Sequence, residues 1–470
     1  MESRAVFDSI SPLDHRYSQS NPALYRELSR YLSESAAVRY CARVEAALLS
    51  VHVTGHDELI RELPDRVEPE AVYREEEKTH HNIRALVNVM RGLVPADVRP
   101  FVHLGATSVD ILDTAQAMRV RDCARNVILP RLAELVSSLA ELSVNHAETA
   151  QVGRTHGQHA VPITFGYAIA EYAARLGKST LSLERLVGDL RGKLAGAVGA
   201  YNALSLVNAD PVATEKQMLE VLGLKPSEHS TQLVEPEHLL RVLLEMNVGF
   251  GVIANLADDL RNLQRSEIAE LQELFTEDQV GSSTMPQKRN PWNSEHVKSL
   301  WKAFSPRVQT FFMDQISEHQ RDLTNSASSR FIADYLTGYA LAIARMQRVV
   351  GTLRVDAARM EENLSARGGA VLAEAAYLLL ALSGHMDSHE AIRTVTLTAD
   401  REGTDFTTAL RNERELWERI SRQLESVRGL DAEEFFANPA TYRGLAAERA
   451  LAIGRRYGEE MKALKERLRR

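Results

Sequence analysis

The sequence is poor in cysteine and in long apolar runs. Cys41 and Cys123 are its only cysteines, so no disulfide framework is indicated and a reducing compartment is expected. No apolar run reaches the roughly 20 residues that a membrane-spanning helix needs. The N-terminal residues also lack the apolar core of a signal peptide. We therefore predict a soluble, cytoplasmic protein that makes no membrane contact.

An excess of positive charge is absent as well. The 56 basic and 64 acidic residues give a net charge of −8, which argues against a dedicated nucleic-acid-binding protein. Local basic pockets for anionic substrates remain compatible with this balance. The 470 residues are enough for several cores or for one large elongated domain.

Strand signals are scarce, and helical periodicity replaces them. The sequence has no alternating apolar pattern of useful length, and no Asn-Gly or Asp-Gly turn between strand-like runs. Leucines instead recur at spacings of three and four, as at Leu132, Leu135, Leu139 and Leu142. Such stripes lie on one helix face and predict long helices packed as a bundle. The predicted fold class is therefore all-α.

Four polar, turn-rich stretches interrupt the helical pattern. They cover residues 103–110, 153–162, 225–236 and 281–291. The longest helical patterns lie between the first and the last of them. The predicted organisation is an N-terminal helical domain (1–108), a central long-helix bundle (109–362) and a C-terminal helical domain (363–470).

The polar loop GSSTMPQKRNP, from Gly281 to Pro291, is the most informative segment. Its two prolines deny helical continuity, and Lys288 and Arg289 bring positive charge close to hydroxyl groups. A solvated surface loop is the ordinary interpretation of such a composition. The whole string, however, resembles the signature loop of the fumarase/aspartase superfamily. That superfamily performs fumarate-forming elimination.

The segment GRTHGQHAVPITFG carries His156 and His159, three residues apart. In a helix this spacing places both on one face. No H-E-x-x-H pattern accompanies them, so a zinc site is disfavoured. A structural histidine and a general acid are the remaining interpretations. The segment resembles the R-T-H-G-x-H-A region of the adenylosuccinate lyase family, which implies that His156 is the proton donor and that His159 supports the site.

The segment EEEKTHHNIRALV reads, from its residues, as a charged and solvated helix start. It resembles the T-x-H-D-V element of the same family, with Thr79, His81 and Ile83 at matching positions. Asn82 stands where the family usually has Asp, and His80 where Arg is common. Both departures alter charge or hydrogen-bond donors beside the substrate.

The segment VHLGATSVDILDTA supplies His103, Thr107 and Ser108 ahead of a helical run. Thr107 or Ser108 is expected to cap that helix. Hydroxyl and N–H groups at a helix N-terminus also form a good carboxylate site. The segment resembles the superfamily motif T-S-x-D, which holds the dicarboxylate part of the substrate.

Three further segments resemble nucleotide-binding elements of the adenylosuccinate lyase family. They are SPLDHRYS with Arg16 and Tyr17, STQ with Gln232, and HQRDLTNSASSR with Arg321, Ser326 and Arg330. From composition alone, the last of these reads as a polar helix start. Two arginines and a hydroxyl suit a phosphate, because guanidinium groups bind phosphate oxygens bidentately.

The resemblance runs from about residue 11 to about residue 330 and implies a function. Its expectations are three helical domains and a homotetramer with active sites shared between subunits. They also include a small-molecule nucleotide substrate, elimination of fumarate, and no metal or organic cofactor. The implied catalytic residues are Ser282 as base, His156 as acid, His81, Lys288 and Glu295, which orients a histidine. The implied substrate-binding residues are Arg16, Tyr17, His80, Asn82, His103, Thr107, Ser108, Gln232, Ser283, Asn290, Arg321, Ser326 and Arg330.

Three alternatives remain open from the sequence. The loop core is shared by the whole superfamily, so a lyase acting on argininosuccinate is possible. A relative adapted to a specialised N-succinyl substrate is the second, given His80 and Asn82. The third is a non-catalytic structural relative, which the joint presence of Ser282, His156 and Lys288 disfavours.

Overall fold

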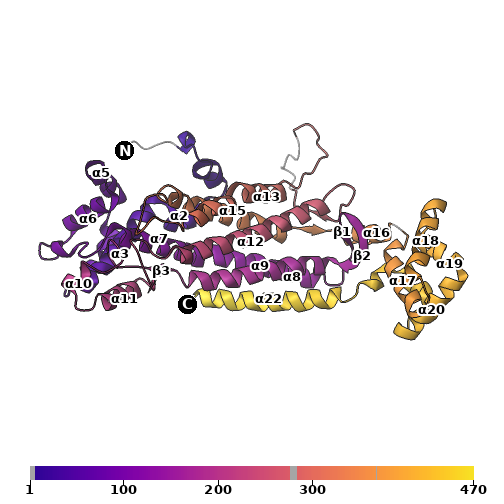
Figure 1. Cartoon of the computed structure of the whole chain (residues 1–470). Coiled ribbons are helices and arrows are strands. Elements are labelled where there is room, and N and C mark those ends of the chain that lie inside the picture. The colour runs from indigo at the N-terminus through magenta and orange to yellow at the C-terminus, as the bar shows by residue number, and fades with distance from the viewer. Residues whose placement is uncertain (1–5, 276–282, 367, 470) are drawn as a thin grey trace.

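The computed structural model describes residues 6–275, 283–366 and 368–469. It is an elongated and predominantly helical molecule, with a helical unit at each end of a central bundle (Figure 1). The predicted all-α class is confirmed, apart from short strands described below.

The unit at the N-terminal end is built from short and medium helices. Its elements are η1 (Val6–Asp8), η2 (Leu13–Tyr17), α1 (Ser18–Ser20), α2 (Pro22–Leu32), α3 (Glu34–His52), α4 (Asp57–Arg66), α5 (Pro69–Thr79), α6 (Asn82–Leu93), η3 (Arg99–Phe101), α10 (Leu204–Val207) and α11 (Pro211–Val221). Glu75 to Glu77 lie in the last turns of α5, so their prediction as a helix start is wrong. The next helix begins only at Asn82, after His80 closes α5 in a left-handed conformation.

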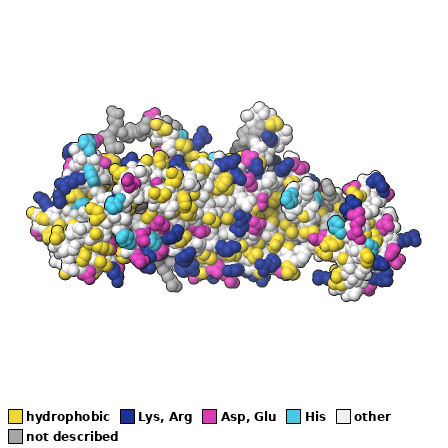
Figure 2. Space-filling model, viewed as in Figure 1, with side chains coloured by type: hydrophobic (Ala, Val, Ile, Leu, Met, Phe, Trp, Pro, Cys, Tyr) yellow, Lys and Arg dark blue, Asp and Glu magenta, His cyan; other side chains and the backbone are white. Residues whose placement is uncertain are grey.

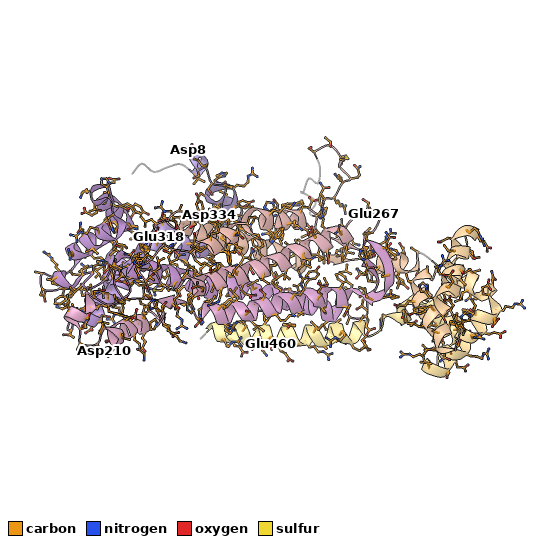
Figure 3. The ribbon with its side chains drawn as sticks, in the orientation of Figure 1. Asp8, Asp210, Glu267, Glu318, Asp334 and Glu460 are labelled. Carbon is orange, nitrogen blue, oxygen red and sulfur yellow. The ribbon has the colours of Figure 1, made fainter. Side chains whose placement is uncertain are left out.

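Long helices form the central bundle. They are α7 (Ser108–Cys123), η4 (Ala124–Ile128), α8 (Leu129–Asn145), α9 (Phe165–Val187), α12 (Pro236–Leu263), α13 (Trp292–Phe304), α14 (Arg307–Met313), η5 (Ser328–Phe331), α15 (Ile332–Gly351) and α22 (Ala446–Arg469). Leu132, Leu135 and Leu139 are buried on α8, as their spacing predicts. In Figure 3, Asp334 on α15 and Glu460 on α22 mark opposite sides of this bundle.

Helix α12 is long and apolar enough, by length and composition alone, to cross a membrane. Within the bundle, 56% of its most apolar stretch is buried. Leu243, Phe250 and Ile253 are at most 1% exposed, so the apolar character serves core packing. The sequence analysis expected no apolar run of membrane-spanning length. Helix α12 corrects that expectation, by length and composition alone.

The C-terminal end has a core of its own. Its elements are α16 (Ala357–Ser365), η6 (Ala370–Leu372), α17 (Ala373–Leu382), α18 (Ser388–Glu402), α19 (Phe406–Asn412), α20 (Arg414–Arg428), α21 (Ala432–Ala437) and η7 (Pro439–Tyr442). Leu380, Ile420 and Phe436 belong to this core.

The last helix, α22, leaves this unit and returns to pack along α8 and α9. Tyr457, Met461 and Leu464 are buried there, and the Tyr457 ring packs so closely on α9 that it leaves no space for a Cβ at Gly177. The predicted C-terminal domain, residues 363–470, thus includes a helix of the bundle. We propose that the smaller unit ends near Tyr442.

The described chain contains three pairs of strands. They are β1 (Ala150–Thr155) with β2 (Gln158–Thr164), β3 (Arg191–Gly192) with β4 (Lys225–Pro226), and β5 (Leu271–Gln272) with β6 (Arg354–Val355). The β1–β2 hairpin contradicts the expectation of no useful strands. Its two-residue turn, His156-Gly157, has φ of 55° and 75°, as a type I′ turn requires. Histidine is an uncommon first residue in such a turn, which hid the hairpin from sequence inspection.

Candidate active site

Three predicted residues meet in a cavity at the N-terminal end, here called the N-terminal cavity. His81, His103 and Ser108 line it together with Arg84 and Arg91, and its volume is about 550 Å³. The Ser108 hydroxyl lies 3.5 Å from His81 Nε2. Residues from two sequence motifs therefore face one basic space, which suits an anionic ligand.

Two helix starts, those of α6 and α7, border this cavity. His81 is the N-cap of α6, and its Nδ1 accepts the Arg84 N–H at 3.2 Å. Asn82, exposed at the first position of the helix, accepts the Ile83 N–H through Oδ1 at 2.7 Å. Thr107 caps α7, which confirms the predicted cap. Helix N-termini of this kind attract carboxylates and phosphates.

A buried ion pair fixes the T-S-x-D motif, residues 107–110, at the start of α7. Asp110 and Lys193 are both 0% exposed and lie in contact. Asp110 also accepts the Thr107 N–H at 2.7 Å and the Ala195 N–H at 3.1 Å. Asp110 is therefore occupied by the protein itself, and its function is to fix the start of α7 beside the N-terminal cavity.

His103 takes part in a second buried contact. Its Nδ1 lies 2.6 Å from Oε1 of Glu45, a residue of α3 that is fully buried. The His103 backbone has φ of 68°, and Gly105 follows with φ of 80°. Sequence inspection did not select Glu45, although a lone acidic residue in the apolar run RVEAALL is a detectable signal.

The residues of the signature loop that are described lie elsewhere along the bundle. Lys288, Asn290 and Glu295 line a cavity of about 990 Å³, here called the loop cavity, together with Arg261 and Arg354. Ser283 is exposed at the start of this stretch. Ser282 lies outside the described residues. The loop cavity is thus rich in cationic groups and holds three of the predicted site residues.

His156 lies at the exposed tip of the β1–β2 hairpin, and His159 lies on β2 opposite Arg154. The two histidines are not on a helix, so the interpretation that places both on one helix face is wrong. The hairpin is anchored by Glu270, which is 0% exposed and accepts from Gln151 at 2.7 Å and from Arg154 at 2.5 Å. This anchoring fixes the base of the hairpin and leaves the His156 imidazole available to a ligand or a second molecule.

Two predicted nucleotide-binding segments touch each other. The Gln232 N–H donates to the Gln320 carbonyl at 3.3 Å, next to Arg321, whose Nε donates to the Asp322 carbonyl at 3.0 Å. Residues 323–327 form a bend and turns, and the segment then enters the short 3₁₀ helix η5, which α15 follows directly at Ile332. This segment leaves Ser326 and Arg330 exposed.

Asp113 supports the Gln232 segment from α7. Its Oδ2 accepts the Val234 N–H at 3.0 Å. Burial raises the pKa of this carboxyl to about 6, although the Val234 hydrogen bond opposes the shift. Asp113 was not among the predicted residues, because its contact joins segments 121 residues apart.

Near the N-terminus, Arg16 is exposed and Tyr17 contacts a histidine that the sequence did not indicate. The Tyr17 hydroxyl lies 3.2 Å from Nε2 of His296 on α13. Burial, and then the charge of Arg345, lower the pKa of His296 below its ordinary value. His296 follows Glu295 directly, so α13 links Tyr17, a predicted nucleotide-binding residue, to the signature loop.

Backbone strain concentrates on histidines. Among described residues other than glycine, six have positive φ, and four of these are His80, His103, His156 and His319. Three of them are predicted site residues. Left-handed backbone at non-glycine residues is uncommon and is often found at functional sites. No group of three or more metal-ligating side chains suited to a metal ion occurs among the described residues.

Within one chain these groups do not form a single site. The N-terminal cavity lies beside α6 and α7 at one end of the bundle, and the β1–β2 hairpin with His156 lies at the other end (Figure 1). Hydrophobic side chains spread over the surface of the bundle between them (Figure 2). Val248 on α12 is 57% exposed and Trp292 on α13 is 43% exposed.

Known protein families match most of this chain. A family described as Lyase matches residues 26–303, and one described as Adenylosuccinate lyase C-terminal matches residues 317–431. The adenylosuccinate lyase of Pyrococcus abyssi is 32% identical over 441 residues, covering 91% of this chain and 95% of the relative. That of Archaeoglobus fulgidus is 29% identical over 469 residues, covering 96% of this chain and 100% of the relative.

Solved structures show the same fold. The 3-carboxy-cis,cis-muconate lactonizing enzyme of Pseudomonas putida has a TM-score of 0.79 and 24% identity, covering 95% of this chain and 100% of that chain. A fumarate lyase of Mesorhizobium sp. BNC1 also has a TM-score of 0.79, with 21% identity over 91% of this chain and 97% of that chain. Such identities establish the fold alone. Because the sequence matches extend over nearly the whole length, this chain is a lyase that belongs to the adenylosuccinate lyase family of the fumarase/aspartase superfamily.

Proposed function

We propose that this enzyme is an adenylosuccinate lyase of purine biosynthesis. It eliminates fumarate from adenylosuccinate to give AMP, and from the succinylated aminoimidazole carboxamide ribonucleotide to give the free carboxamide. The observation that carries the proposal is the meeting of His81, His103 and Ser108 in one basic cavity. The relatives named adenylosuccinate lyase support the choice of substrate.

The proposed chemistry begins with a proton that lies beside a substrate carboxylate and is barely acidic. Ser282, by resemblance to the family loop, removes this proton, and the electrons move into the carboxylate as an aci-carboxylate dianion. Lys288 and Asn290 stabilise the developing charge, as positioned donors do in other enzymes. Thr107 and Ser108 hold the substrate carboxylates at the start of α7.

The C–N bond breaks in the second half of the reaction. The electron pair of the dianion forms the fumarate double bond, and the nitrogen leaves with the bonding pair. His156 gives a proton to this nitrogen, and Glu295 orients a catalytic histidine. A positioned acid or base of this kind typically contributes about 10²–10⁴-fold to the rate. The proposed steps involve no cofactor.

The nucleotide part of the substrate is assigned to the remaining predicted residues. Arg321, Ser326 and Arg330 bind the phosphate, and Gln232, Arg16 and Tyr17 bind the base and ribose. His80, Asn82, His103 and Ser283 complete the binding set. The backbone hydrogen bond from Gln232 to Gln320 supports this assignment, because it joins two of these segments.

We further propose that the enzyme is a cytoplasmic homotetramer whose active sites are shared between subunits. The separation of the His156 hairpin from the N-terminal cavity supports this proposal, because a single copy does not bring them together. The exposed apolar side chains of α12 and α13 supply surface for subunit contact.

Mixing two inactive variants tests the shared site. His81→Ala, in the N-terminal cavity, and His156→Asn, in the hairpin, are each expected to inactivate the enzyme. Unfolding and remixing the two variants together should restore part of the activity, since some sites then combine an intact cavity of one subunit with an intact hairpin of another. A mixture that stays inactive, although light scattering shows mixed tetramers, contradicts the shared site.

The substrate is tested by the absorbance change on turnover of adenylosuccinate beside argininosuccinate. Turnover of adenylosuccinate alone supports the proposal. A second candidate is a lyase for another N-succinyl compound, favoured by the neutral Asn82 and by His80, which are the sequence neighbours of the cavity residue His81. Fumarate release from neither substrate by the intact enzyme supports that candidate instead.

A further inference from the structure

A buried carboxylate lies directly behind the N-terminal cavity. Glu45 on α3 is 0% exposed, and its Oε1 lies 2.6 Å from His103 Nδ1. The other oxygen, Oε2, is buried and has no hydrogen-bond partner among the described residues. Among the described residues, His103 therefore supplies the side-chain hydrogen bond of this buried carboxylate.

We propose that Glu45 is a positioning residue that holds His103 as an imidazolium, whose Nε2–H faces the N-terminal cavity and binds an anionic group of the substrate. The identity of the anion rests on the function proposed above. The Glu45–His103 pair itself rests on the geometry.

The position of the proton follows from relative basicity. A hydrogen bond of 2.6 Å needs one proton between Glu45 and Nδ1, and imidazole is the more basic partner, because ordinary pKa values are about 6.5 for histidine and about 4.3 for glutamate. With only that proton, the buried pair keeps a net negative charge, which is costly away from water. A second proton on Nε2 makes the pair neutral.

The backbone holds the ring in this orientation. His103 has φ of 68°, in the left-handed region that histidine adopts only occasionally, within the loop between η3 and α7. Its side chain is 22% exposed. Since Nδ1 faces Glu45, Nε2 is the nitrogen left for the cavity.

Other charged and titratable groups face the same space. Arg84, Arg91 and His81 line it from α6, and the half-buried His52 of α3 lies beside the backbone of Leu104. No carboxylate occurs among the described lining residues. The two arginines oppose a positive charge on His103, whereas the 2.6 Å contact with the Glu45 carboxylate favours it, and a bound anion favours it further.

His81 provides a contrast within the same cavity. Its Nδ1 accepts the backbone N–H of Arg84 at 3.2 Å and has no carboxylate partner among the described residues. His103 and His81 therefore differ in the partner of their Nδ1 atoms. A carboxylate holds the first, and an N–H group holds the second.

Chemical modification tests the pair without a substrate. Diethyl pyrocarbonate acylates a neutral imidazole and not an imidazolium. In Glu45→Gln at pH 7, we expect His103 to be acylated at least fivefold faster than in the unaltered enzyme, as measured by peptide mass spectrometry. The exposed His156 serves as the internal reference. Equal His103 rates in the two proteins overturn the proposal.

Thermal unfolding supplies a second test that is also independent of turnover. His103→Asn leaves the Glu45 carboxylate buried without a cation, so we expect a clear fall in Tm. Adding Glu45→Gln to that variant removes the unpaired charge, and the Tm of the double variant rises again. A double variant less stable than His103→Asn shows that the two residues do not form a charge pair. This cycle remains informative if Glu45→Gln alone folds poorly.

Kinetics then separate positioning from general structure. For Glu45→Gln we expect KM for adenylosuccinate to rise about tenfold while kcat changes less than threefold. In the His103→Asn background the same change has no further effect on KM. If the effects of the two substitutions on KM are additive, Glu45 does not act through His103. If the unaltered enzyme does not act on adenylosuccinate, the proposed function fails, whereas the acylation and unfolding results still decide the pair.

Discussion

The N-terminal cavity and the hairpin end of the bundle are built in different ways. Around the cavity, buried charges hold the predicted site residues. Asp110, paired with Lys193, accepts the Thr107 N–H next to Ser108, and Glu45 contacts His103. At the other end, His156 lies exposed on a two-residue turn, and only the base of its hairpin is anchored. Firmly held side chains of the N-terminal cavity and the exposed His156, the proposed proton donor, thus occupy opposite ends of one chain. Substitutions at the first end should alter stability, and those at the second should alter turnover.

The largest expected effect is at the hairpin. His156→Asn removes the proton donor but keeps the turn, because Asn-Gly is a preferred type I′ sequence. We expect kcat to fall about 10²–10⁴-fold while Tm changes little. Steady-state kinetics and calorimetry measure both, with His389→Ala, at an exposed position of α18, as the control. If His156→Asn lowers Tm together with kcat, the two ends of the bundle do not differ in the way described.

The next effect concerns the buried pair under α7. Lys193→Met leaves Asp110 as a buried charge without its cation, and we expect about 3–5 kcal/mol less free energy of unfolding. Urea unfolding measures the loss. Lys216→Met is the matched control, because the Lys216–Glu220 pair is 68% and 65% exposed and such pairs contribute little. Similar losses for both lysines contradict the assigned importance of burial.

A pH effect should come from Asp113. Its pKa is raised to about 6 in the folded chain, from an ordinary value near 4, so the folded state binds the proton more tightly. The group then favours the folded state at low pH, and this contribution is lost as pH rises through about 6. We expect Asp113→Asn to remove about 1 kcal/mol of pH dependence between pH 5 and pH 7.5.

Urea unfolding at the two pH values measures the Asp113 effect, and Asp400→Asn on the surface of α18 is the control. Identical pH dependence in the unaltered enzyme and in Asp113→Asn shows that this carboxyl titrates normally.

The smallest effect is at the cap of α7. Thr107→Ala removes the side chain that caps the helix, and we expect about 1 kcal/mol less free energy of unfolding. KM should rise as well, because the cap shapes the substrate end of the helix. Thr394→Ala, in the middle of α18, controls for loss of a threonine. A rise in KM with unchanged stability would indicate that Thr107 contacts the substrate without supporting the helix.

Local patterns were sufficient to predict much of the fold. The leucine spacing on α8 and the cap at Thr107 are properties of consecutive residues, and the structure confirms both. The β1–β2 hairpin escaped because His156-Gly157 is an unusual type I′ pair, and its strand β2 contains Pro162. The turn at His80 escaped because helix ends depend on single residues.

The missing parts of the candidate site have a common cause. Glu45, Asp113 and His296 each act through a residue far along the chain, at separations of 58, 121 and 279 residues. No local pattern encodes such contacts. The segments recognised by family resemblance, in contrast, include the residues proposed to touch substrate.

The return of α22 to the bundle has a consequence for the order of folding. Helices α16 to α21 are consecutive in the chain, so their small core can form from near contacts, which close quickly. The surfaces of α8 and α9 that α22 covers stay exposed until residues 446–469 have been synthesised. These residues follow α8 by some 300 positions in the chain. During synthesis, the small C-terminal unit can therefore be complete while the older bundle still exposes apolar surface, a period in which the chain is open to aggregation or to chaperones.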